Sequence, residues 1–258
     1  MKYLFFFICF VSLAQTKPHL ETKFLDKTPV SQNRLIGFDN FNTKYTLHDN
    51  TLYKITNTDT LNYTNLQLGA IQDVNTFNPL KINLFYQDFN TVIVLDNRLA
   101  EIFKIDFNSN AYYKNAGHIT TGSDNTVWVF NQDTQQLDLF DYKSKTTRLS
   151  TIPLQSPVLD IASNYNYCWV LTKRHLYAFN YFGSLVYKIQ NDGFKRLSEN
   201  NGSIFLSNAH SLFYLKKDTQ TLTPVDLPEL LINRFFVTGE TLYIYDNNFL
   251  YKYQLKTN

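Results

Sequence analysis

Short runs of alternating apolar and polar residues recur along the whole chain, and no long stretch has the 3.6-residue period of an amphipathic helix. The clearest unit is an apolar strand, a polar turn and a second, mixed strand. Six copies of this hairpin align on one apolar position each, namely Leu47, Val94, Val129, Val170, Phe205 and Ile244. Their spacings are 47, 35, 41, 35 and 39 residues, so the hairpin returns about every forty residues.

A repeat of this length, built from short strands, is typical of a β-propeller, in which each repeat forms a blade of four antiparallel strands. β-Sandwiches do not keep such a period, and the coils of a β-helix are shorter. The sequence therefore predicts an all-β protein, a six-bladed β-propeller that occupies residues 15–258 as one domain. In the second blade we expect the four strands at residues 79–86, 91–95, 98–106 and 110–115.

The last repeat has three expected strands and then the sequence ends. Near the other end, residues 21–27 (ETKFLDK) belong to no blade. A strand from the N-terminal part that completes the last blade would hide a sheet edge that otherwise invites aggregation. We therefore predict that residues 23–26 pair with residues 250–254.

The first fourteen residues have the features of a cleaved secretory signal peptide. Lys2 supplies a positive charge, residues 3–11 are an apolar run too short to span a bilayer, and Ser12 and Ala14 are small. The alternative is a buried N-terminal strand. Cleavage would leave Cys168 as the single cysteine, which excludes an intramolecular disulfide. We expect an exported protein, periplasmic or extracellular, with no transmembrane segment after cleavage.

Composition narrows the class of partner. Apolar residues make up 44% and aromatic residues 16% of the chain, which is enough for a folded core. The formal net charge is +2 and no basic run stands out, so the sequence argues against nucleic acid as the main partner.

One short motif suggests a family. Residues 96–103, DNRLAEIF, are similar to the Asp, Asn, Arg, Ile, Phe pattern of NHL repeats, with shortened spacing and in one blade only. With its six repeats, the chain resembles the six-bladed β-propellers of the NHL and TolB-like kind found in bacterial envelopes. This resemblance implies the fold but little about function, because propellers include enzymes, ligand-binding proteins and scaffolds.

Standard catalytic motifs are missing from the sequence, which has no G-x-S-x-G, no Gly-rich phosphate loop, no H-E-x-x-H and no cysteine pair at zinc spacing. We therefore assign no catalytic residue, no metal ligand and no cofactor. A different pattern is present in the expected first strand of each blade, where a charged or titratable residue precedes an apolar one. These residues are Arg34, Lys81, His118, Asp160, Arg196 and Arg234.

The first strands of a propeller line its central channel, so these six side chains would form a ring at one depth. Four of them, the lysine and the three arginines, are positively charged at neutral pH. At a narrow mouth these charges would attract an anion or the acidic side chain of a partner. Alternatively, these side chains lie between the blades and pair locally.

The sequence favours a non-enzymatic, exported scaffold for protein–protein interaction, an accessory subunit of an outer-membrane or secretion assembly with protein partners in the cell envelope. The aromatic turn at residues 181–183 is suited to such contacts. The alternative is a small-ligand-binding protein or a metal-dependent, lactonase-like hydrolase with its site in the channel. Asn83, Asp160 and Glu199 would be its candidate ligands, although the basic residues nearby would oppose a divalent cation.

Overall fold

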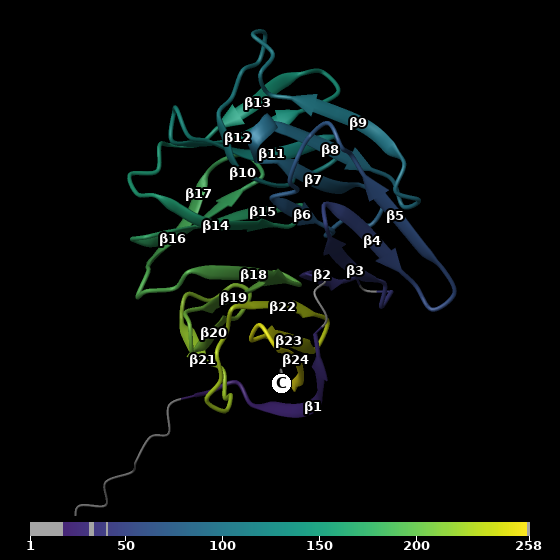
Figure 1. Ribbon diagram of the computed structural model, residues 1–258. Helices are drawn as coiled ribbons and strands as arrows, with labels where there is room; N and C mark the ends of the chain where they lie inside the picture. Colours follow the sequence, from purple (N-terminus) through teal and green to yellow (C-terminus); the bar gives the residue numbers. More distant parts are fainter. Residues whose placement is uncertain (1–17, 31–33, 40, 257–258) are drawn as a thin grey trace, which may run out of the picture.

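The chain forms a ring of six small sheets around a central channel (Figure 1). The computed structural model describes residues 18–30, 34–39 and 41–256, and the expected signal peptide lies outside these residues. Within them there are six four-stranded antiparallel sheets and one short 3₁₀ helix. The predicted all-β, six-bladed propeller is confirmed. Among the described residues, no helix is long and apolar enough to cross a membrane.

Within blades 1 to 5, the strands follow one another from the channel outward in chain order. Blade 1 contains β2 (Arg34–Phe38), β3 (Lys44–His48), β4 (Thr51–Ile55) and β5 (Thr60–Thr64). Blade 2 contains β6 (Asp73–Asn75), β7 (Ile82–Tyr86), the 3₁₀ helix η1 (Gln87–Phe89), β8 (Thr91–Leu95) and β9 (Glu101–Asp106). Blade 3 contains β10 (Ala116–Thr121), β11 (Thr126–Asn131), β12 (Gln136–Asp141) and β13 (Thr146–Ser150). Blade 4 contains β14 (Val158–Ser163), β15 (Tyr167–Thr172), β16 (His175–Asn180) and β17 (Leu185–Gln190). Blade 5 contains β18 (Arg196–Asn200), β19 (Ser203–Ser207), β20 (Leu212–Leu215) and β21 (Leu222–Pro224). Blade 6 contains β22 (Arg234–Thr238), β23 (Thr241–Tyr245), β24 (Phe249–Leu255) and, from the start of the chain, β1 (Thr22–Pro29).

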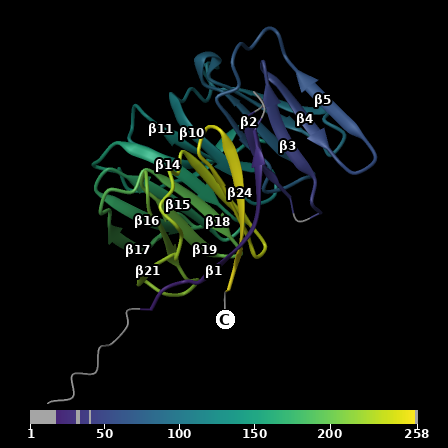
Figure 2. The ribbon, with the colours of Figure 1, turned by 60° about the horizontal axis from the view of Figure 1, so that its bottom comes forward.

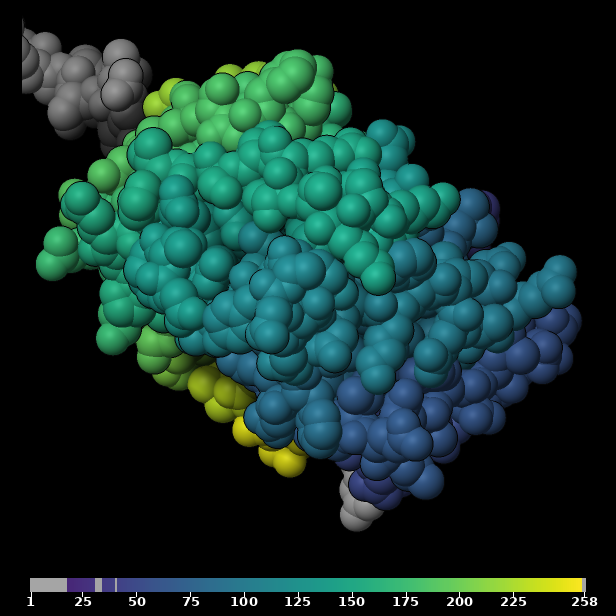
Figure 3. Space-filling model, turned by 90° about the horizontal axis from the view of Figure 1, so that it is seen from above, coloured from purple at the N-terminus to yellow at the C-terminus, as the bar shows by residue number. Residues whose placement is uncertain are grey.

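The core is divided among the contacts between adjacent blades. Five clusters of buried side chains lie between blades 1 and 2, 2 and 3, 3 and 4, 4 and 5, and 5 and 6. In β11, Val127 and Val129 pack toward blade 2, whereas Trp128 and Phe130 pack toward blade 4. Successive side chains of a strand point to opposite faces, and here a neighbouring blade covers each face. The second strands are therefore largely apolar, and polar side chains within them, such as Thr46 and Asn83, are buried. Figure 3 shows blade 3 (teal) from the rim, between blades 2 and 4.

The contact between blades 6 and 1, which we call the seam, is built differently. No buried apolar cluster joins these two blades among the described residues. Aromatic rings meet there instead: Phe38 and Phe236 each stack on Tyr243, with ring centroids 4.8 and 4.7 Å apart. The hydroxyl group of Thr238 donates to the carbonyl of Phe38 at 2.9 Å. Among the described residues, the seam is thus the one contact between adjacent blades that has no buried apolar cluster.

Strand β1 closes the ring. It runs antiparallel along β24, with Lys23 opposite Gln254 and Asp26 opposite Lys252 (Figure 2). The predicted closure of the last blade by an N-terminal strand is confirmed, and β1 extends beyond the predicted segment to Pro29.

The segment before β1 also reaches blade 5. The N–H of Leu20 donates to the carbonyl of Pro224 at 2.9 Å, and the carbonyl of Leu20 accepts the N–H of Asp226 at 2.8 Å. The side chain of Leu20 is buried in the cluster between blades 5 and 6. The start of the chain therefore ties the last two blades together.

The predicted strand order of blade 2 is wrong by one strand. The expected first strand, 79–86, contains β7, which is the second strand, and the expected second and third strands correspond to β8 and β9. Residues 110–115 form no strand. The true first strand, β6, has only three residues and shows too little alternation to be recognised. Because β7 and β8 are both entirely buried, their apolar pattern cannot tell the second strand from the third.

Candidate functional site: the channel mouth

Six titratable side chains meet at one end of the central channel, and each comes from the first strand of a different blade. We call them the ring residues: Arg34, Asp73, His118, Asp160, Arg196 and Arg234. Each is followed by an apolar residue, and in five of the six blades this residue, such as Val74 or Leu197, packs into a cluster between blades. Strand alternation then directs the ring residue toward the channel. In β10 and β14, an irregularity in pairing precedes His118 and Asp160 and brings both into the ring.

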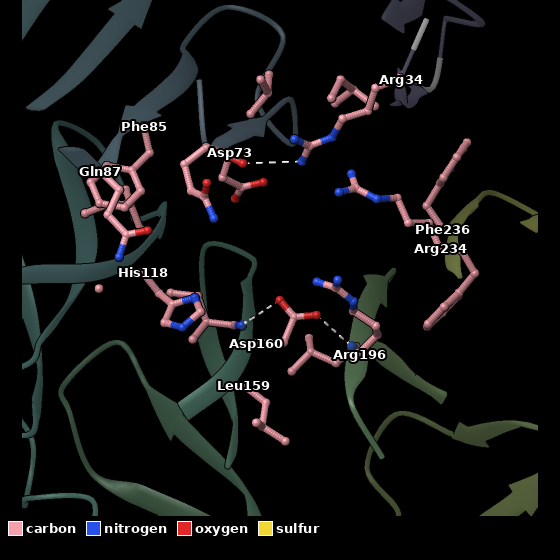
Figure 4. Close-up of a pocket in the computed structure, with 18 of the residues that line it drawn as sticks. Arg34, Asp73, Phe85, Gln87, His118, Leu159, Asp160, Arg196, Arg234 and Phe236 are labelled. Atoms are coloured by element: carbon pink, nitrogen blue, oxygen red, sulfur yellow. Dashed lines mark hydrogen bonds between the residues drawn. The ribbon is translucent and has the colours of Figure 1, made fainter. Parts of the chain in front are cut away.

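The ring residues line a cavity of about 560 Å³, which we call the channel mouth (Figure 4). Pockets that bind small molecules or inserted side chains usually enclose about 300–1,000 Å³. The cavity is therefore large enough for a small ligand or for a short segment of a partner.

The structure brings together five of the six residues that the sequence predicts for the ring. The exception is Lys81, which precedes the second strand β7 and does not line the mouth. Its ammonium group donates to the carbonyl of Asp124 and to Oδ1 of Asn125, at 2.5 and 3.2 Å, in a turn of blade 3. Asp73 occupies the position in blade 2. The signal was available in the sequence, because Asp73 also stands directly before an apolar residue, 39 residues after Arg34.

This correction changes the charge pattern. Three arginines lie on consecutive blades 5, 6 and 1, and we call them the arginine arc: Arg196, Arg234 and Arg34. The other three blades carry what we call the acidic arc: Asp73, His118 and Asp160. Figure 4 shows the three guanidinium groups on one side of the cavity and His118 on the opposite side, with the two carboxyl groups between them. The mouth is polarised rather than uniformly positive.

The arginine arc forms no ion pair among the described residues. Among the described residues, no carboxylate lies within 4.0 Å of any of these guanidinium groups. Arg34 donates from one terminal nitrogen to the carbonyl of Gln72 at 3.3 Å, whereas its Nε is buried and has no hydrogen-bond partner among them. Burial, together with repulsion from Arg34 and Arg196, lowers the pKa of Arg234 to about 10. An anion at this point would accept a hydrogen bond from Arg34, and its negative charge would raise the pKa of Arg234 again.

The carboxyl groups of the acidic arc are also perturbed. Asp160 accepts the N–H of Leu197 through Oδ2 at 2.9 Å and its neighbour's N–H through Oδ1 at 3.0 Å, which ties blade 4 to blade 5 (Figure 4). Burial raises the pKa of Asp160 to about 7. The side chain of Asp73 is exposed to the channel, but desolvation by the surrounding channel wall raises the pKa of its carboxyl group, an effect that the nearby Arg34 opposes. Burial lowers the pKa of His118, which favours the neutral imidazole.

The three candidate metal ligands do not share one cavity: Asp160 and Glu199 line a further hollow of about 360 Å³, but Asn83 lines neither that hollow nor the channel mouth. Asn83 is buried in β7 and donates to the hydroxyl of Thr121 at 2.9 Å. Glu199 accepts Nδ2 of Asn164 at 3.0 Å and the N–H of Gly202 at 2.7 Å. Neither lines the mouth beside Asp160. Within residues 18–30, 34–39 and 41–256, no group of three or more His, Cys, Asp or Glu side chains could hold a metal ion.

A second hollow of about 880 Å³ lies between blades 4 and 5. From the sequence, only its aromatic turn at residues 181–183 was predicted to contact a partner. The turns that border it connect the first and second strands and the third and fourth strands. We call it the aromatic groove, after its aromatic lining residues: Phe77, Tyr165, Tyr167, Trp169, Tyr181, Phe182 and Tyr187. Phe77 of blade 2 makes an edge-to-face contact with Tyr165 of blade 4, with ring centroids 5.0 Å apart. Exposed aromatic side chains in such a groove are suited to contacts with another protein.

No protein-family model matches the sequence, and no curated protein is similar to it in sequence. Several solved structures share the fold. Virginiamycin B lyase from Staphylococcus aureus is 13% identical, with 85% of this chain and 79% of that chain covered and a TM-score of 0.62. A chain of the mitotic checkpoint complex is 11% identical, with 92% and 86% covered and a TM-score of 0.63. BamB from Moraxella catarrhalis is 11% identical, with 82% and 69% covered and a TM-score of 0.50. At these identities the likeness shows the propeller fold alone.

Proposed function

We propose that the protein is a non-enzymatic scaffold for protein–protein interaction and that its channel mouth receives an acidic group of the partner. One observation carries the proposal: three arginines from adjacent blades converge on one cavity, and none is paired with a carboxylate among the described residues. The aromatic groove supplies further surface for the partner.

A carboxylate in the mouth would form charge-assisted hydrogen bonds with guanidinium groups that are partly shielded from water. It would also reduce the repulsion among the three cations. Removing one member of such a buried charge pair at an interface typically costs 2–5 kcal/mol. At the lower limit this corresponds to about thirty-fold weaker binding.

The cellular setting is part of the proposal. The sequence pattern of residues 1–14 supports export, and the resemblance to NHL and TolB-like propellers supports a role in a bacterial envelope, as an accessory subunit of an outer-membrane or secretion assembly. The structural likeness to a chain of the mitotic checkpoint complex illustrates that this fold is used within protein assemblies. These features support the proposal without identifying the partner.

The second candidate function is a small-ligand site or a hydrolase in the channel. It is favoured by the placement of His118 and Asp160 in one cavity, since a neutral imidazole and a carboxyl group with a pKa of about 7 can exchange protons near neutral pH. Turnover of a lactone or another ester by the purified protein, abolished by His118→Gln, would favour this candidate over the scaffold.

The test of the scaffold replaces the arginine arc. The triple variant Arg34→Gln, Arg196→Gln, Arg234→Gln and the control Lys81→Gln would each be used to capture partners from envelope extract. For a captured partner, surface plasmon resonance would give the dissociation constant. We expect the triple variant to bind at least thirty-fold more weakly and the control to bind like the original protein. Equal binding by the triple variant, with an unchanged circular dichroism spectrum, would refute the proposal.

A further inference from the structure

The two arcs of the channel mouth are kept apart, although opposite charges meet at two places in the ring. Arg34 is next to Asp73 on the adjacent blade, and Asp160 is next to Arg196. If the charges served only to neutralise each other, these neighbours would form ion pairs. Neither pair comes within 4.0 Å among the described residues.

At each junction, one of the two side chains is held by backbone groups instead. Arg34 donates to the carbonyl of Gln72, and Asp160 accepts two backbone N–H groups, one of them from Leu197 of blade 5. These contacts fix the side chains in the wall of the cavity, and they leave the positive and negative sides of the mouth separate.

A separated pair of arcs discriminates among occupants. An occupant with only a carboxylate would suit the arginine arc but would face the carboxyl groups across the cavity. An occupant with only a cationic group would face three guanidinium groups. An occupant that carries both signs is complementary to both arcs, provided that its charges lie as far apart as the arcs.

We propose that the mouth binds an amphoteric peptide segment, which places an acidic side chain on the arginine arc and an ammonium or guanidinium group beside Asp73. Asp73 is the acceptor because its side chain is exposed to the channel, whereas each carboxyl oxygen of Asp160 already accepts a backbone N–H. This inference rests on the proposed function for its acidic half. It adds the second charge and the residue that recognises it.

An extended segment can present two charged side chains to the same wall. Side chains two positions apart on an extended chain point to the same side, and their α-carbons are about 6.6 Å apart. We therefore expect recognition of an acidic and a basic residue that are separated by one residue.

The experiment uses four capped tripeptides and isothermal titration calorimetry with the purified protein. Ac-Glu-Ala-Lys-NH2 carries both charges, Ac-Glu-Ala-Gln-NH2 and Ac-Gln-Ala-Lys-NH2 carry one each, and Ac-Gln-Ala-Gln-NH2 carries none. We expect the amphoteric peptide to bind at least about ten-fold more tightly than the anionic one, as one charged hydrogen bond would give. We expect the cationic and neutral peptides to bind more weakly than the anionic one.

The variant Asp73→Asn should remove the preference for the amphoteric peptide and keep the binding of the anionic one. Asp59→Asn, on an exposed turn that lines neither the channel mouth nor the aromatic groove, is the matched control and should keep the preference. Asp73→Ser, checked by its thermal melt, separates loss of the charge from a disturbed strand β6.

Three results would overturn the inference: equal affinity for the amphoteric and anionic peptides, a preference that survives Asp73→Asn, or no measurable binding of any peptide. Tighter binding of 6-aminohexanoate than of the amphoteric peptide would assign the mouth to a free zwitterion and would also overturn it. The proposed function fails separately, if the triple arginine variant still binds the anionic peptide or the captured partner. A failure confined to the Asp73 variants would leave the scaffold proposal standing.

Discussion

Replacing Leu20 with alanine should destabilise the whole propeller, although this residue lies near the start of the chain and outside every blade strand. Only 7% of Leu20 is exposed, in the cluster between blades 5 and 6. Its backbone forms hydrogen bonds on both sides, with Pro224 and Asp226. The side chain therefore anchors the segment that leads into the closing strand β1.

The expected loss follows from the burial. Truncating a buried leucine to alanine costs about 2–5 kcal/mol, depending on how far the cavity collapses. Domains are typically stable by about 5–15 kcal/mol, so a loss near 3 kcal/mol would be a large fraction of the total. Leu25 is the matched control, because it lies in β1 itself but is 47% exposed. Leu25→Ala should change the free energy of unfolding by less than about 0.5 kcal/mol.

Urea denaturation followed by tryptophan fluorescence would measure both variants, and hydrogen exchange would report on the amides of β24. In Leu20→Ala, the β24 amides that pair with β1 should exchange faster, because opening of the closing strand exposes them. A loss below 1 kcal/mol, or a loss equal to that of Leu25→Ala, would refute the view that the N-terminal segment belongs to the cooperative unit.

Three further predictions concern stability. Lys114→Met leaves the carboxylate of Asp138 buried without its ammonium partner, so chemical denaturation should show a loss of about 3–5 kcal/mol that Asp138→Asn on the same background largely restores. The folded-state pKa of Asp160, about 7, lies above its unfolded value, so the folded protein binds the proton more tightly. The free energy of unfolding should therefore fall as pH rises from about 4 to 7, and Asp160→Asn should remove this part of the slope. Gly183 has a φ of 76°, and an added Cβ would lie 2.7 Å from a leucine methyl group, so Gly183→Ala should cost about 1 kcal/mol or more in the same assay.

The architecture could be predicted from the sequence because its signal is repeated. Each second strand is covered on both faces, so an apolar run such as β11 recurs in every blade and gives the period. The closure of blade 6 could be predicted by counting strands. The last repeat had three expected strands instead of four, and residues 21–27 near the N-terminus belonged to no blade. Blade 2 broke the pattern because β6 is short and its third strand is as apolar as its second.

The site was only partly predictable for a related reason. The pattern of a titratable residue directly before an apolar one does mark the ring positions. In blade 2, however, β7 was taken for the first strand, so the pattern selected Lys81 instead of Asp73 in β6. That single exchange replaced a cation by a carboxyl group and turned a predicted positive ring into a polarised one. The lack of ion pairs at the mouth was beyond the sequence, because it depends on backbone contacts such as that between Asp160 and Leu197 of the next blade.

The position of the arginine arc links recognition to the integrity of the ring. Arg234 and Arg34 lie on opposite sides of the seam, the contact between blades that has no buried apolar cluster among the described residues. Two partly buried cations on either side of a weak contact repel each other, and this repulsion opposes the stacking of Phe38 of blade 1 on Tyr243 of blade 6. A carboxylate held by both arginines would replace that repulsion with a bridge between blades 6 and 1. Strand β1 closes blade 6 at its outer edge, so an occupant of the mouth would complete the closure from the channel side.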